Sequence, residues 1–146
     1  MKRNFNEYNI SILSDFYEYT MAQGYFNEKL DNKITYFDIF YRSNPDNASY
    51  AIFSGLEHLV EILNSMKFND EDIEYFKSLN TFDDKFLNFL KNFKFECDIW
   101  SVPEGSVIFP KEPIMTVRGP AVQAQLIETI ALLIINHESL IATKSN

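Results

Sequence analysis

The chain has 146 residues, of which 46% are hydrophobic and 23% charged, so it predicts a folded domain and excludes a disordered tail or a collagen-like fibre. A formal net charge of −8 argues against nucleic acid or an anionic membrane as a partner, because basic side chains that neutralise phosphate dominate such binding. One cysteine, Cys97, rules out an internal disulfide and predicts the reducing cytoplasm. The sequence predicts neither a signal peptide nor a membrane span.

The first part of the sequence predicts a helix followed by a strand. Helical spacing extends over Asp15–Leu30, with Ser14 as the cap and Asp15 in the positive first turn. The β-branched and aromatic stretch Ile34–Arg42 predicts a strand. The apolar side expected for the helix consists of Leu13, Phe16, Tyr17, Met21 and Gly24.

The middle of the chain predicts a short strand and three helices. The strand is Tyr50–Phe53, and Gly55 opens the first helix. Asn69 and Thr81 are expected to cap the other two, each followed by acidic residues that favour a helix N-terminus. The apolar side expected for the first helix consists of Leu56, Leu59, Val60 and Leu63.

A strand-rich subregion is expected at residues 95–120. Its three strands are Ile99–Val102, Ser106–Phe109 and Ile114–Val117, and prolines punctuate the segments between them. We expect antiparallel pairs that turn at Gly105 and near Lys111. Helices mixed with hairpin-like strands predict an α+β fold and not a doubly wound sheet.

The last long segment, Ala121–Ala142, predicts a single helix with aliphatic residues on every side. Such a helix is normally buried in a larger body. It is either an ordinary C-terminal helix with a polar end or a connection to a further domain. We expect the second, so that residues 1–146 form one α+β domain and residues 121–144 a connecting helix that leads to a part not included here.

Few residues suggest chemistry on their own. The chain has four glycines and no glycine-rich phosphate loop, and its histidines and cysteine lack the spacing of metal ligands. His58 is expected to be solvated or hydrogen-bonded, and His137 to be a satisfied core histidine. The acidic clusters at residues 70–72 and 83–84 are explained by helix N-termini without a metal.

Several stretches in register resemble the N-terminal part of nicotinate phosphoribosyltransferases. They are LSDFYEYTMAQGY (13–25), FDIFYRSNP (37–45), VPEGSVIFPKEP (102–113) and LIATK (140–144), and YAIFSGL (50–56) and QLIET (125–129) fit the same family. The resemblance implies an enzyme that joins nicotinate to phosphoribosyl diphosphate, using ATP and Mg²⁺, in a homodimer whose base site is shared between subunits. The family's α/β barrel and its phosphorylated histidine belong to a part beyond this chain, and neither His58 nor His137 matches that histidine. This chain alone is therefore expected to be inactive.

The resemblance also implies four substrate-binding residues and no catalytic residue in this chain. Tyr17 matches the tyrosine that stacks on nicotinate, and Asp15 matches the acidic residue two positions before it. Arg42 and Lys144 are candidate phosphate contacts, because a guanidinium or an ammonium group suits phosphate oxygens. From the residues alone, Tyr17 is a core aromatic side chain, Arg42 pairs with Asp38 on one strand face, and Lys144 is solvated; these alternatives stay open.

Two other functions stay open at this point. The first is a nicotinamide phosphoribosyltransferase, which shares the architecture, although the YRSNP stretch is closer to the nicotinate enzymes. The second is a non-catalytic binding or assembly module, in which the strands of residues 98–119 only dock a partner.

Overall fold

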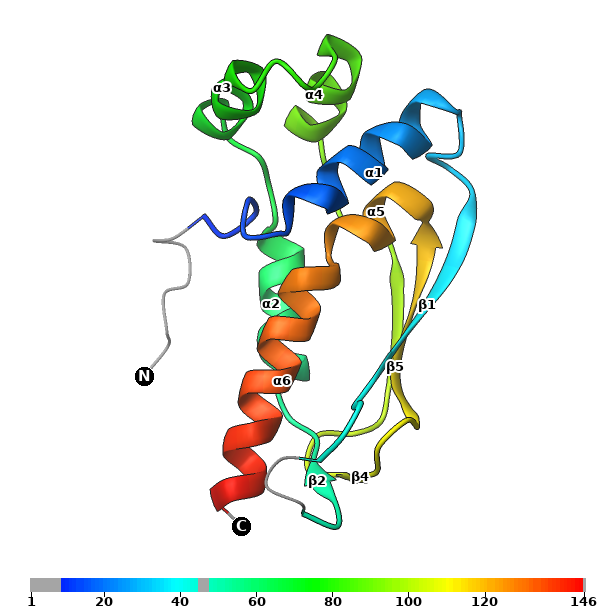
Figure 1. Cartoon of the computed structure of the whole chain (residues 1–146), viewed down its shortest axis with the longest axis vertical. Coiled ribbons are helices and arrows are strands. Elements are labelled where there is room, and N and C mark those ends of the chain that lie inside the picture. The colour runs from blue at the N-terminus through cyan, green and yellow to red at the C-terminus, as the bar shows by residue number, and fades with distance from the viewer. Residues whose placement is uncertain (1–8, 45–47, 146) are drawn as a thin grey trace.

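The computed structural model describes residues 9–44 and 48–145 and confirms an α+β fold of helices and antiparallel strands (Figure 1). Within these ranges none of the helices is long and apolar enough to cross a membrane. The elements are α1 (Phe16–Asn27), β1 (Ile34–Phe40), β2 (Ala51–Ile52), α2 (Leu56–Ser65), α3 (Asp70–Ser78), α4 (Asp84–Lys91), β3 (Asp98–Ser101), β4 (Val107–Ile108), β5 (Pro113–Pro120), α5 (Ala121–Leu126) and α6 (Glu128–Ser145).

The main sheet has the antiparallel order β1-β5-β3, and α2, α5 and α6 lie on one side of it (Figure 1). The expected antiparallel pairing of the strand-rich subregion is confirmed for β3 and β5. It is wrong for β4, which pairs with β2 in a separate sheet. The paired residues Ala51 and Ile108 are both buried. β4 therefore pairs with a strand distant in sequence, and this pairing buries the Ile108 side chain. The chain does turn at Gly105 and Lys111, which both have positive φ.

Helix α1 is confirmed, but its buried side is not the expected one. Phe16, Tyr17 and Met21 are exposed, whereas Glu18, Tyr19 and Ala22 face the interior. The expected cap is also wrong. Asp15 occupies the N-cap position, and the Ser14 hydroxyl donates to the Leu126 carbonyl oxygen instead. Contacts with α5 and α6, distant in sequence, thus decide which side of α1 is buried.

The predicted helix Ala121–Ala142 is two helices. α5 ends at Leu126, Ile127 has φ −101° and ψ −1°, and α6 then begins at Glu128. All six residues of α5 are buried, while α6 exposes Leu132, Leu133 and Ile141. Within this chain α5 is thus buried as a helix with aliphatic residues on every side normally is, whereas α6 is only partly covered.

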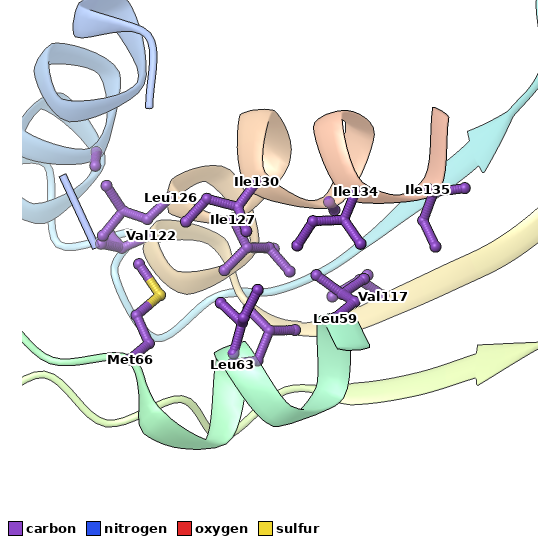
Figure 2. Close-up of a cluster of buried hydrophobic side chains, with 14 of the residues drawn as sticks. Leu59, Leu63, Met66, Val117, Val122, Leu126, Ile127, Ile130, Ile134 and Ile135 are labelled. Atoms are coloured by element: carbon purple, nitrogen blue, oxygen red, sulfur yellow. The ribbon is translucent and has the colours of Figure 1, made fainter. Parts of the chain in front are cut away.

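The core lies between α2, α5, α6 and the inner face of β5. Figure 2 shows side chains of α6 directed toward Leu59 and Leu63 of α2, with Val117 of β5 beside them. The expected apolar side of α2 is confirmed only in part. Val60 is exposed, and Ile62, which was not expected, is buried with Leu59 and Leu63. A second part of the core joins α1, α3 and α4 through ring contacts among Phe16, Tyr19, Phe26, Phe68, Phe76, Phe82, Phe86, Phe89 and Phe93.

Helix caps are local in α3 and α4 and long-range in α2. Asn69 caps α3 as expected, in a reciprocal pair with Asp72. Thr81 does not cap α4, because Asp83 takes that position and accepts a hydrogen bond from the Phe86 N–H. At α2, Glu104 Oε1 accepts hydrogen bonds from three successive backbone N–H groups, those of residues 55–57. A carboxylate is favourable there because it meets the positive end of the helix dipole.

Candidate functional site

The start of α1 and the start of α6 are joined by side-chain hydrogen bonds. The Thr129 hydroxyl accepts from the Asp15 backbone N–H at 3.3 Å and donates to the Glu18 carboxylate. The Thr129 backbone N–H also donates to Glu18 Oε1, at 3.0 Å. The stretches 13–25 and 125–129, more than 100 positions apart in sequence, therefore meet at one junction.

Glu18 is fully buried at this junction. Burial raises the pKa of its carboxyl group, although the hydrogen bonds from Thr129 oppose the shift. Its Oε2 atom has no hydrogen-bond partner among the described residues. The neutral acid is thus favoured relative to a solvated glutamate, because the charged form would lose its hydration.

Tyr17 lies at the outer edge of the same junction and is 44% exposed, so the alternative of a core aromatic side chain is wrong. Its hydroxyl donates to Glu128 Oε1 at 2.9 Å. That hydrogen bond, with smaller effects of burial and neighbouring carboxylates, raises the pKa of Tyr17 to about 12. The hydroxyl is therefore a fixed donor, and the open ring is a flat surface on which a planar ligand can stack.

A groove of about 660 Å³ runs along α6 next to this junction. Its lining includes both Glu128 and Arg42, the second of which follows β1. Glu128 and Asn136, another lining residue, are eight positions apart, which is about 12 Å along a helix. The Tyr41 hydroxyl donates to the Asn136 carbonyl oxygen at 3.2 Å, so the segment that carries Arg42 is held against α6.

The predicted site residues are only partly brought together. Asp15 is exposed at the start of α1, close to Tyr17, and Arg42 lies farther along the groove. Asp38 accepts a hydrogen bond from Thr116 at 2.6 Å, and within the described ranges no ion pair joins it to Arg42. Lys144 is sixteen residues beyond Glu128 on α6, about 24 Å along the helix axis, so the structure does not place it near Tyr17.

Glu18 and Glu128 were not predicted from the sequence as site residues. Glu128 could have been found from the sequence, because it lies in the stretch QLIET, which resembles the family. Nothing in the sequence indicated that Glu18 would be buried, since a glutamate on a helix is normally solvated.

A second, larger groove of about 920 Å³ lies between α2 and α6 and contains none of the four predicted residues. His58 and Glu138 line it and approach to 2.5 Å, which confirms a hydrogen-bonded His58. His137, also in its lining, is exposed, so the expectation of a core histidine is wrong.

The acidic, histidine and cysteine side chains of residues 9–44 and 48–145 are not arranged as a metal site. In the part of the chain that the structure describes, three or more His, Cys, Asp or Glu side chains are nowhere grouped so that they could hold a metal ion. The acidic residues at the starts of α3 and α4 are used as helix caps or first-turn charges.

Comparison with known proteins shows the family to which the chain is similar. Residues 12–136 match the family model described as the nicotinate phosphoribosyltransferase N-terminal domain. A nicotinate phosphoribosyltransferase of Mycobacterium tuberculosis (strain ATCC 25618 / H37Rv), pncB2, is 39% identical over 135 residues, which are 92% of this chain and 29% of that protein. The Bacillus subtilis (strain 168) nicotinate phosphoribosyltransferase is 37% identical over 99% of this chain and 30% of its own length.

Solved structures agree with the fold. The crystal structure of human nicotinic acid phosphoribosyltransferase matches with a TM-score of 0.83 and 31% identity, over 90% of this chain and 27% of that one. The family model and this structural match show that the fold is that of the N-terminal domain of a phosphoribosyltransferase. The chain belongs to the nicotinate phosphoribosyltransferase family and spans less than a third of the length of these relatives.

Proposed function

We propose that the protein carrying this chain transfers the phosphoribosyl group of phosphoribosyl diphosphate to nicotinate, giving nicotinate mononucleotide and diphosphate. The observation that carries the proposal is the exposed ring of Tyr17, whose hydroxyl is held by Glu128 where two family stretches meet. A planar pyridine ring can stack on that surface. The chain would thus contribute one wall of the nicotinate site.

The charge of the chain supports a model in which other parts of the protein bind most of the phosphate groups. Phosphoribosyl diphosphate is strongly anionic, whereas this chain has a net charge of −8 and its groove contains one arginine, Arg42. A guanidinium group there can bind one phosphate through two parallel hydrogen bonds. Most phosphate ligands, the use of ATP and Mg²⁺, and a homodimer that shares its base site would depend on residues outside this chain. Such an enzyme would serve NAD salvage.

The proposal is tested in the complete protein, expressed from its gene, by measuring the KM values of both substrates. Tyr17→Ala should raise the KM of nicotinate about tenfold or more, because it removes a stacking partner worth about 0.5–1.5 kcal/mol and the area that the ring buries. The KM of phosphoribosyl diphosphate should change much less. Tyr17→Phe keeps the ring and should cost far less than Tyr17→Ala.

Two results would contradict the proposal. One is a Tyr17→Ala protein that is less stable but has an unchanged KM for nicotinate. The other is a wild-type protein that forms nicotinamide mononucleotide from nicotinamide and no product from nicotinate. As a separate check, the 146-residue chain alone should form no nicotinate mononucleotide.

A further inference from the structure

We propose that Glu128 is a positioning residue for the nicotinate site: it acts through Tyr17 and fixes the plane on which the substrate ring stacks. This inference rests on the proposed function, because it assigns how the stacking surface of that site is held. It begins from the placement of Tyr17 in the first turn of α1, where this residue is 44% exposed.

An exposed tyrosine ring is free to change rotamer unless its polar end is held. In this structure the Tyr17 hydroxyl is held by Glu128 Oε1 at 2.9 Å. The contact joins α1 to α6, so the ring is fixed at its backbone by one helix and at its hydroxyl by another. A ring held at both ends presents one orientation to a ligand, and binding then costs less ordering entropy.

Glu128 is itself fixed. Its second carboxylate oxygen, Oε2, accepts a hydrogen bond from Gln125 Nε2 at 3.0 Å, and Gln125 is only 3% exposed. Glu128 is also the first residue of α6, where the helix dipole stabilises a negative charge. A buried amide, a carboxylate and a tyrosine hydroxyl therefore form one chain of hydrogen bonds that ends at the exposed ring.

The helix break at Ile127 is part of this arrangement. It starts α6 at Glu128, so that Glu128 and Thr129 both meet α1. Glu18 binds the Thr129 N–H from the buried side of α1, while Tyr17 binds Glu128 from the exposed side. Adjacent residues of α1 thus hold adjacent residues of α6, which keeps the two helix starts in register.

The test is a double-mutant cycle in the complete protein. Glu128→Ala and Tyr17→Phe each remove the same hydrogen bond, and each should raise the KM of nicotinate about threefold, as expected for a partly exposed hydrogen bond. kcat and the KM of phosphoribosyl diphosphate should change little. In the Tyr17→Phe background, Glu128→Ala should have no further effect. With Tyr17 intact, Glu128→Gln keeps an acceptor oxygen for the Tyr17 hydroxyl and should leave the KM of nicotinate close to the wild-type value. Glu138→Ala is the matched control, since it removes a side-chain contact elsewhere on α6.

An independent measurement separates this inference from the proposed function. Fluorotyrosine placed at position 17 of the 146-residue chain is titrated by fluorine NMR, and Glu128→Ala should lower its pKa. An unchanged titration, or KM effects of Glu128→Ala that add fully to those of Tyr17→Phe, would overturn the positioning role. The wild-type protein could instead be inactive on nicotinate while Glu128→Ala lowers the pKa as expected. That result would overturn the proposed function and, with it, the positioning role, and would show only that Tyr17 and Glu128 form a hydrogen bond.

Discussion

Gly119 of β5 and Cys97, just before β3, lie in such close contact that a methyl group on Gly119 would be 2.3 Å from Cys97 Sγ. Cβ atoms do not approach other atoms so closely without a shift of the structure. The cysteine side chain thus occupies the space that a residue larger than glycine would need. Burial raises the pKa of the Cys97 thiol to about 12, which keeps it an unreactive, space-filling group.

Gly119→Ala should therefore destabilise the domain by about 1–3 kcal/mol, the usual cost of overpacking. Urea unfolding measures the effect. Cys97→Ala in the same chain should recover part of the loss, because it removes the sulfur atom but leaves the Cβ atom 2.8 Å away. Equal stability of Gly119→Ala and wild type would show that β3 and β5 are not packed in this way.

Ser139→Ala should be more harmful than an ordinary serine substitution. The Ser139 hydroxyl is fully buried, accepts from the Ser54 N–H at 3.0 Å and donates to the Ser54 carbonyl oxygen at 3.1 Å. Alanine would leave both backbone groups without a partner, at a cost of about 1–3 kcal/mol for each unsatisfied buried group. Ser65→Ala is the control, because the Ser65 hydroxyl only donates to the Ile62 carbonyl oxygen within its own helix. Similar losses of unfolding free energy in both variants would contradict this account.

Glu18 predicts a pH dependence of stability. Burial raises the pKa of the Glu18 carboxyl above its ordinary value of 4.5, so the folded protein binds this proton more tightly than the unfolded chain does. Its contribution to stability is fully present below pH 4.5 and is lost as the pH rises through the pKa of the folded state. Glu18→Gln should remove this loss, so the stability of the variant relative to wild type should increase with pH. Urea unfolding from pH 4 to pH 8 tests this, and parallel curves for the two proteins would contradict it.

Exposed aliphatic residues on α6 predict association of the isolated chain. Leu133 and Ile141 are each 51% exposed and are eight positions apart, hence on one side of the helix. Apolar surface of this kind favours association. The 146-residue chain should self-associate in sedimentation experiments or bind an apolar dye, and Leu133→Lys with Ile141→Lys should reduce both. Val60→Lys, an exposed aliphatic residue on α2, should have little effect, and a wild-type monomer that binds no dye would contradict the prediction.

Local signals in the sequence determined the features that depend on a few neighbouring residues. Asn69 and Asp72 are three positions apart, so their reciprocal capping of α3 needs no other part of the chain. The strand predicted at Ile34–Arg42 is likewise confirmed as β1, because its β-branched and aromatic residues lie within a single short stretch. The family stretches were also readable from the sequence, including the one that contains Tyr17.

Only the tertiary structure decided the features that depend on distant partners. No glycine or proline marks Ile127, yet the helix breaks there, where α5 is buried and Thr129 binds Glu18 of α1. The same contacts turned Tyr17 outward and buried Glu18, the reverse of what their hydropathy favours. Residues more than 100 positions apart meet only after the chain has folded, and the free energy of those contacts outweighs local helix preference. The sequence therefore predicted Tyr17 as a candidate site residue, and the packing of α1 against α6 decided that Glu128 holds its hydroxyl.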